Sequence, residues 1–283
     1  MLHPRVKRAL ELSGLHERLK VSVVRDFYWA VVDRRWLRAR RDEINFYRKL
    51  LQEFQPGDLI FDIGANVGDK TDVFLRLGAR VVVVEPDETC QKIISEKFLK
   101  LRFSPKPVVI IGKAVSDEVT TKTMWVDGPK SALNTLSDKW VTALKGEQKR
   151  FDTAVSSQEF GVQKKVETVT LGQLIATHGM PFFVKIDVEG YEHIALKGLT
   201  RPVPYLSFEV NLPEFRPEAA DCVQLLEKIE PRGQFNYAAD CHAGLSLHDW
   251  LKAPELLEIL ATIQEKSIEV FWRTAAGVGR KVA

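Results

Sequence analysis

The pattern of hydrophobic and polar positions along the chain is that of an α/β protein. Short apolar runs rich in β-branched residues alternate with segments in which apolar residues recur at helical intervals. Most of the runs show little polar alternation, which is typical of parallel strands covered by helices on both faces. The pattern therefore predicts a doubly wound, mainly parallel sheet. The predicted strands are residues 59–63, 80–85, 108–115, 182–187, 205–210, 234–239 and 267–275, and the predicted helices are residues 69–77, 88–100, 170–178, 188–199, 216–229 and 248–265.

Two regions depart from this alternation. Residues 5–54 carry apolar positions at helical intervals among many arginines, and the turn-forming "QPGD" separates them from the first strand. We therefore expect an N-terminal helical extension over residues 1–54 and a main domain over residues 55–283. Residues 116–165 are polar and irregular, and we expect them to form an insertion that covers a site.

The charge of the chain is concentrated at its beginning. The net charge is only +3, which is too small to indicate a nucleic-acid partner, but residues 1–41 hold eleven Lys or Arg against four Asp or Glu. An apolar stripe in this segment predicts that it packs on the main domain. A peripheral contact with an anionic membrane, or dimerisation, is the alternative use of such a basic helix. The stripe consists of Phe27, Trp29, Val32 and Trp36.

The remaining composition points to an ordinary globular protein of a reducing compartment. Hydrophobic residues make up 45% of the chain and charged residues 28%. Cys90, Cys222 and Cys241 have neither metal-binding nor redox spacing. No stretch reaches about eighteen apolar residues, and the N-terminus has no apolar segment of the secretory kind. We therefore expect a cytoplasmic protein.

The stretch "LIFDIGANVGDKTDVF" (59–74) predicts a ligand-binding turn between a strand and a helix. Gly64 and Gly68 lack a Cβ atom, so a ligand can approach the backbone, and the helix that follows offers free N–H groups. Asp62 lies at the carboxyl end of the strand, where open α/β sheets bind ligands. Glu85 ends the next strand, and its carboxylate can accept hydrogen bonds from two ribose hydroxyls. A nucleoside is therefore the predicted ligand, with a purely structural turn as the alternative.

The turn favours S-adenosylmethionine over a dinucleotide. The dinucleotide fingerprint needs a middle glycine to admit the pyrophosphate, but here Ala65 and Asn66 follow Gly64. A ligand with one ribose and no pyrophosphate fits this turn, and the cationic amino-acid end of S-adenosylmethionine suits a nearby Asp62. An NAD(P)-dependent oxidoreductase is the rival interpretation.

Six motifs in sequence order carry a more specific resemblance. "FDIGANVGDKT", "VVVVEPDE", "GKAVSD", "VETVTLGQLI", "FVKIDVEGYEHIALKGL" and "LSFEVN" together resemble the FkbM family of S-adenosylmethionine-dependent methyltransferases over residues 57–240. The resemblance implies a class I, Rossmann-like sheet of seven strands with a reversed last strand, which "SIEVFWRTA" fits. It also implies O-methylation of a sugar, glycan or other natural product. The expected cofactor residues are Asp62, Gly64, Ala65, Asn66, Gly68, Glu85, Pro86, Ala114, Val115 and Asp187.

Charged residues inside two predicted strands are the candidates for catalysis. Lys185 and Asp187 point to one face of their strand, and a lysine in an apolar strand is costly unless it is paired. In the sheet order that the family implies, the strands of Asp62, Lys185 and Glu209 are neighbours, so Lys185 can lie between carboxylates. One interpretation is a buried structural ion cluster. The other is that Asp187 and Glu209 frame the cavity beside the transferable methyl group.

Methyl transfer to a hydroxyl needs alignment and a group that takes the proton. Asp187 is the first candidate base, Glu209 is expected to orient the acceptor or Lys185, and His242 in "ADCHAGLS" is the second candidate base. Asp187, Glu209 and Asn211 can also hold Mg²⁺, but Lys185 already supplies positive charge, so we expect no metal. A small-molecule or glycan acceptor is the expected partner, and a catalytically inactive methyltransferase-like protein is the alternative.

Overall fold

The computed structural model describes residues 34–100, 105–128, 130–146 and 162–275. Most of the predicted N-terminal extension, including Phe27, Trp29 and Val32 of its apolar stripe, lies outside these residues. Within the described residues, no helix is both long enough and apolar enough to cross a membrane.

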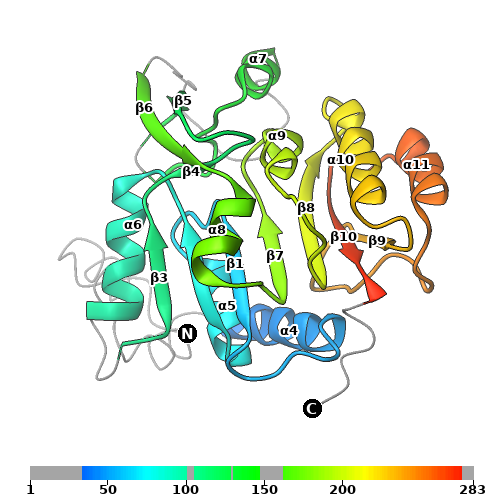
Figure 1. The fold of residues 1–283 in the computed structure, drawn as a ribbon, viewed down its shortest axis with the longest axis horizontal. Helices are drawn as coiled ribbons and strands as arrows, with labels where there is room; N and C mark the ends of the chain where they lie inside the picture. Colours follow the sequence, from blue (N-terminus) through cyan, green and yellow to red (C-terminus); the bar gives the residue numbers. More distant parts are fainter. Residues whose placement is uncertain (1–33, 101–104, 129, 147–161, 276–283) are drawn as a thin grey trace.

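A seven-stranded sheet forms the centre of the molecule (Figure 1). Its order is β3-β2-β1-β7-β8-β10-β9, and the pairs are parallel except that β10 runs antiparallel to both β8 and β9. The predicted doubly wound fold with a reversed last strand is therefore confirmed. The strands are β1 (Leu59–Ile63), β2 (Arg80–Val84), β3 (Val108–Ile111), β7 (Phe183–Ile186), β8 (Tyr205–Asn211), β9 (Gln234–Ala238) and β10 (Ser267–Arg273).

Helices cover both faces of the sheet, because alternate strand residues are apolar on each side. One core lies between the sheet and α4, α5 and α6, and the other lies between the sheet and α7 to α11. The predicted helix over residues 188–199 begins only at Glu192, and the one over residues 248–265 is shorter at both ends. The helices are α4 (Arg34–Leu50), α5 (Asp69–Leu77), α6 (Glu88–Ser95), which continues as the π-helical turn η1 (Glu96–Lys100), α7 (Asp138–Gly146), α8 (Leu171–His178), α9 (Glu192–Lys197), α10 (Arg216–Ile229) and α11 (Ala253–Thr262).

The expected irregular insertion is in part regular structure. The predicted strand 108–115 breaks after Ile111, and β4 (Ala114–Val115) leaves the main sheet to pair with β6 (Val162–Val169). β5 (Thr121–Val126) pairs antiparallel with β6 and completes a three-stranded sheet. Both β5 and β6 carry many polar residues, so their apolar pattern is weak, and their pairing bridges distant parts of the sequence. Figure 1 shows this small sheet above the carboxyl ends of β1 and β7.

The described part of the N-terminal extension packs on the main sheet. Phe46, Tyr47 and Leu50 of α4 are buried, and the Phe46 ring meets the Phe271 ring of β10 edge to face, with 5.5 Å between centroids. The ring of Trp36 lies beneath the guanidinium group of Arg40, at 5.0 Å. The helix therefore forms one wall of the core and does not stand apart from the domain.

Replacing a buried aromatic residue of α4 tests this packing. We expect Phe46→Ala to lower the free energy of unfolding by about 3–5 kcal/mol, because it removes apolar contacts and leaves a cavity. The matched control is Asn45→Ala on the exposed side of the same helix, with an expected change within about 0.5 kcal/mol. Urea unfolding of both variants measures the difference. Equal stability of the two variants would show that α4 does not belong to the core.

Candidate active site

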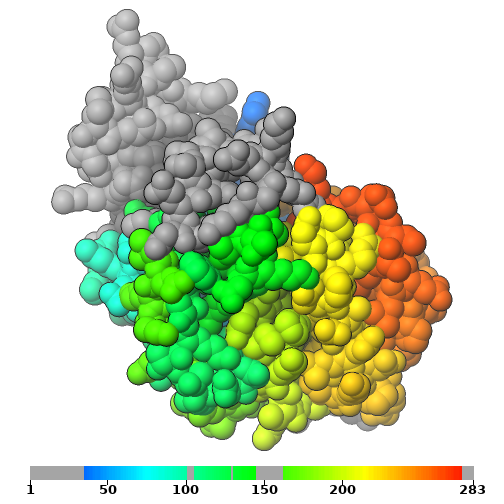
Figure 2. Space-filling view, turned by 90° about the horizontal axis from the view of Figure 1, so that it is seen from above, coloured from blue at the N-terminus to red at the C-terminus, as the bar shows by residue number. Residues whose placement is uncertain are grey.

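Two cavities open near the carboxyl ends of the central strands. The first cavity encloses about 660 Å³, part of it open to solvent, and lies between β1, β2, β7 and the segment of residues 131–136. The second cavity encloses about 590 Å³ and lies between β7, β8, β10 and the loop after β9. Asp187 lines both cavities. Figure 2 views the molecule from this side, where the green residues around β5 and α7 cover the middle of the surface.

The turn between β1 and α5 has the backbone conformation that its glycines predict. Gly64, Asn66 and Gly68 have φ angles of 75°, 49° and 76°, which lie in the left-handed region. A Cβ atom on Gly64 would lie 1.8 Å from the carbonyl oxygen of Asp187. We expected a ligand to need that space, but the end of β7 occupies it. The glycine therefore brings β1 and Asp187 together.

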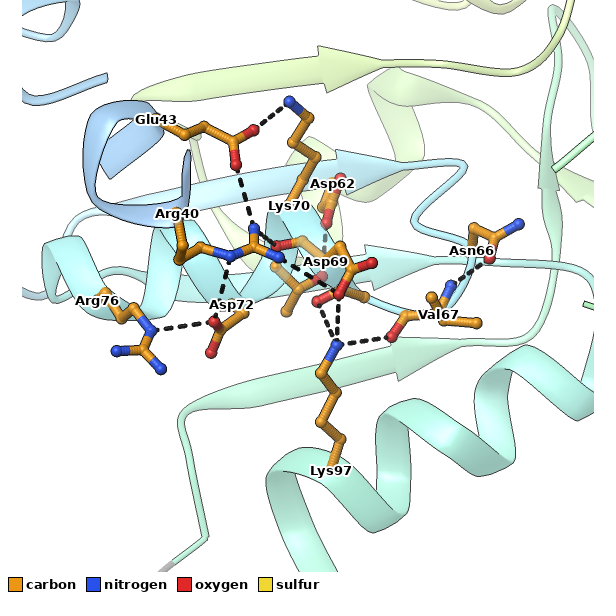
Figure 3. Close-up of polar contacts among 12 residues, drawn as sticks. Arg40, Glu43, Asp62, Asn66, Val67, Asp69, Lys70, Asp72, Arg76 and Lys97 are labelled. Atoms are coloured by element: carbon orange, nitrogen blue, oxygen red, sulfur yellow. Dashed lines mark hydrogen bonds and ion pairs between the residues drawn. The ribbon is translucent and has the colours of Figure 1, made fainter. Parts of the chain in front are cut away.

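Two buried cationic side chains, Lys97 and Arg40, bind the end of this turn and the first residue of α5 (Figure 3). Lys97 donates from Nζ to the carbonyl oxygen of Val67 at 3.2 Å and to Oδ1 of Asp69 at 2.8 Å. Arg40 of α4 donates to the carbonyl oxygen of Asp69 at 2.7 Å. Because the carbonyl of Asp69, the first residue of α5, is held by a side chain from α4, the N-terminal extension supports the element that follows this turn as well as the core.

Glu85, the predicted ribose acceptor, lies directly after β2 and lines the first cavity. Its Oε1 accepts a hydrogen bond from the backbone N–H of Asp87 and its Oε2 accepts one from the N–H of Asn66, both at 2.8 Å. A carboxylate has about four acceptor positions, so two remain for ligand hydroxyls. Burial raises the pKa of Glu85, and the two backbone hydrogen bonds lower it. Burial is the larger effect, so the net pKa is about 7.

The first cavity gathers most of the expected cofactor residues. Asp62, Ala65 and Gly68 do not line it. Asp62 is 1% exposed, accepts a hydrogen bond from Thr71 Oγ1, and lies in register with Lys185 on the neighbouring strand. Burial raises its pKa. Asp62 is therefore an internal partner of Lys185 and does not face the cavity. The expected residues that line the cavity are Gly64, Asn66, Glu85, Pro86, Ala114, Val115 and Asp187.

The far wall of the first cavity comes largely from residues 116–165, the region expected to cover a site, although the sequence did not identify which of its residues would do so. It is formed by Ser131, Ala132, Asn134, Thr135 and Leu136, together with Met124, Lys113, Glu189 and Tyr191. Asn134 donates from Nδ2 to Oδ2 of Asp87 at 3.2 Å, and Thr135 donates from Oγ1 to the carbonyl oxygen of Glu189 at 2.7 Å. These two bonds tie the segment across the cavity, from the end of β2 to the end of β7.

Lys185 is the buried cation of the second cavity. Lys185 is 3% exposed, and its Nζ donates a hydrogen bond to Oδ2 of Asp187 at 2.7 Å. Burial acts to lower the pKa of Lys185, but the carboxylates of Asp187, Glu269 and Asp62 outweigh it, and the net pKa is raised. The ammonium group therefore stays charged and must be balanced by the acids around it.

Asp187 and Glu209 differ in protonation although they are neighbours. Burial opposes ionisation of Asp187, but the Lys185 cation and a hydrogen bond from Glu209 hold its pKa below the usual range. Burial and the Asp187 charge raise the pKa of Glu209 well above its usual range, and Oε1 of Glu209 accepts a hydrogen bond from Ser267 at 2.8 Å. Asp187 is therefore the ionised member of the pair, and Glu209 carries the shared proton.

The second cavity brings together all four residues expected to take part in catalysis. Lys185, Asp187 and Glu209 line its inner part, and His242 lies exposed in its lining. Among the described residues, no group of three or more His, Cys, Asp or Glu side chains is arranged to hold a metal ion. The further lining residues include Lys70, Asp240, Cys241, Ser267 and Glu269.

The segment that carries the turn and most of these side chains matches a known family. Residues 62–238 match the Methyltransferase FkbM domain. The chain belongs to the FkbM methyltransferase family. The resemblance seen in the sequence is thereby confirmed, the oxidoreductase interpretation is disfavoured, and S-adenosylmethionine is the methyl donor.

The following solved structures have a similar fold and are distant in sequence. A methyltransferase from Agrobacterium tumefaciens is 9% identical with a TM-score of 0.42, covering 83% of this chain and 62% of its own length. A TehB-like methyltransferase from Corynebacterium glutamicum is 9% identical with a TM-score of 0.39, covering 88% and 99%. The plantazolicin methyltransferase BpumL, solved with S-adenosylhomocysteine, is 12% identical with a TM-score of 0.41, covering 94% and 96%. Likenesses at this level decide nothing about the acceptor, and no curated protein matches the chain significantly.

The raised pKa of Glu85 predicts that cofactor binding depends on pH. Ribose hydroxyls donate to the ionised carboxylate, so we expect S-adenosylmethionine to bind roughly tenfold more tightly at about pH 8 than at about pH 6. Calorimetric titrations across this range measure the affinity. Glu85→Gln should bind more weakly at every pH and lose the pH dependence.

Glu192→Gln is the matched control for this prediction. The pKa of Glu192 is also raised to about 7 by burial, but Glu192 accepts hydrogen bonds from the backbone N–H groups of Val188 and Gly190 and does not line the first cavity. The pH dependence should persist in this variant. If it also persists in Glu85→Gln, Glu85 is not the ribose acceptor.

Proposed function

We propose that the protein transfers the methyl group of S-adenosylmethionine to a hydroxyl oxygen of a neutral, hydroxyl-rich acceptor such as a sugar or glycan. The observation that supports this is the position of Asp187, which lines both cavities. With the cofactor in the first cavity and the acceptor in the second, the two reactants meet at this residue.

The residues of the first cavity suit the charge of the methyl donor. S-adenosylmethionine supplies an electrophilic methyl group on a positively charged sulfur. Asp187 is ionised at the junction of the two cavities, where it can face that charge, and Glu85 can fix the ribose at the other end. Holding the reacting atoms close and in line supplies much of the rate of such a displacement.

The second cavity suits a neutral acceptor better than an anionic one. Both of its lysines already contact carboxylates, since Lys70 pairs with Glu43 of α4 and Lys185 pairs with Asp187. Asp240 and Glu269 add negative charge to the same wall. A phosphate or carboxylate group would therefore meet repulsion there, whereas hydroxyl groups find many acceptors for their hydrogens.

Isotopic labelling tests the proposed reaction. The protein is incubated with S-adenosylmethionine that carries a ¹³C-methyl group, together with a panel of methyl glycosides and, in a second arm, the polar small-molecule fraction of a bacterial lysate. We expect a labelled methyl ether, identified by mass spectrometry and by the carbon chemical shift of its O-methyl group. A label found only on nitrogen, carbon or sulfur, or no label in either arm, would contradict the proposal.

A further inference from the structure

If the acceptor is a hydroxyl group, as proposed above, a residue of the second cavity must take its proton. Asp187 is a weak proton acceptor, because Lys185 and Glu209 hold its pKa low. Glu209 favours its protonated form, because burial and the charge of Asp187 raise its pKa. His242 lies exposed in the cavity lining. The inner wall of the cavity therefore needs another base.

Glu269 of β10 is a carboxylate that three separate elements hold in place. It lines the second cavity and lies directly opposite Glu209 in the antiparallel pairing of β8 and β10. Its Oε1 accepts hydrogen bonds from Ser207 Oγ of β8 at 2.6 Å and from Tyr47 Oη of α4 at 3.4 Å. Its Oε2 accepts one from Cys241 Sγ, in the loop after β9, at 3.2 Å.

The three groups that donate to Glu269 among the described residues are neutral, whereas Asp187 contacts the ammonium group of Lys185 directly; Lys185 and Lys70 interact with Glu269 through their charge. Burial raises the pKa of Tyr47 and that of Cys241, with the charge of Glu269 adding to both effects, so both groups keep their protons and act as donors. The hydrogen bonds fix the orientation of the carboxylate, and its remaining acceptor positions are open to a molecule in the cavity. This is the arrangement that a positioned general base requires.

We propose that Glu269 is the catalytic base that takes the proton of the acceptor hydroxyl, and that Tyr47 is its positioning residue. In this step, the acceptor oxygen forms a bond to the methyl carbon while the carbon–sulfur bond breaks and its electron pair stays on sulfur. The hydroxyl proton moves to a carboxylate oxygen of Glu269, whereas the O–H bonding pair remains on the acceptor oxygen. The positive charge on sulfur and the negative charge on Glu269 disappear together.

The proposed base and its positioning residue come from segments outside the matched domain. Tyr47 and Glu269 both lie outside residues 62–238. Tyr47 is fully buried, and Glu43, one helical turn earlier in α4, pairs with Lys70 of the same cavity. Helix α4 thus does not line the second cavity itself but holds two of its lining residues, Glu269 and Lys70, in place.

The experiment compares Glu269→Gln with Glu269→Asp, and uses Glu265→Gln, an exposed residue just before β10, as the matched control. The probes are ¹³C-methyl S-adenosylmethionine and the methyl glycosides and lysate fraction described above. We expect Glu269→Gln to lower kcat at least about 10²-fold, as for the loss of a general base. Its affinity for S-adenosylmethionine by calorimetry should equal that of the wild type. Glu269→Asp should keep more activity than the glutamine variant, and the control should keep full activity.

Tyr47→Phe provides a readout that separates positioning from stability. It removes one hydroxyl and keeps the ring contacts with Phe74 and Phe183. We expect a several-fold fall in kcat with an unchanged melting temperature and an unchanged KM for S-adenosylmethionine. A lower melting temperature with unchanged kcat would overturn the positioning role of Tyr47.

The outcomes distinguish this inference from the proposed function. If the wild type labels oxygen and Glu269→Gln keeps its rate within about threefold, or the Asp and Gln variants lose activity equally, Glu269 is not the base and the proposed function stands. If the wild type labels another element or nothing, the proposed function fails and the assignment of Glu269 falls with it.

Discussion

The organisation of this site depends on a single buried cation. Lys185 sits in the middle of an apolar strand, and an ammonium group at that depth is tolerated only when carboxylates surround it. Asp187 contacts it directly, the charges of Glu269 and Asp62 act on it from other strands of the sheet, and the protonated Glu209 lies beside Asp187. The acids of four strands are thereby drawn to one face of the sheet, toward α4.

The charge of Lys185 also gives these acids different protonation states. It keeps Asp187 ionised at the junction of the two cavities, and the Asp187 charge in turn keeps Glu209 protonated. Asp62 is confined to the interior. Glu269 is held by neutral donors and opens into the second cavity. The Lys185–Asp187 ion pair therefore lies where the first and second cavities meet, and α4 packs behind the residues around it.

Much of this could be predicted from sequence, because several features are local. The strand pattern predicts the sheet, and the spacing of glycines with Glu85 predicts the nucleoside site. The irregular composition of residues 116–165 predicts that they cover a site, but not that residues 131–136 form the cavity wall, since long-range bonds to Asp87 and Glu189 place this segment. Glu269 could have been found, because the argument that singles out Lys185 applies equally to an acid in "SIEVFWRTA". The position of Tyr47 had no sequence signal, since it follows from how α4 crosses the sheet.

The central claim is that Asp187 marks the point where methyl donor and acceptor meet. The most direct measurement is a crystal structure of the full chain with S-adenosylhomocysteine bound. The ribose hydroxyls should lie within hydrogen-bonding distance of Glu85, and the sulfur should lie beside Asp187, facing the cavity that contains Glu269. A sulfur atom that points away from that cavity, or a ligand bound elsewhere on the chain, would contradict the account.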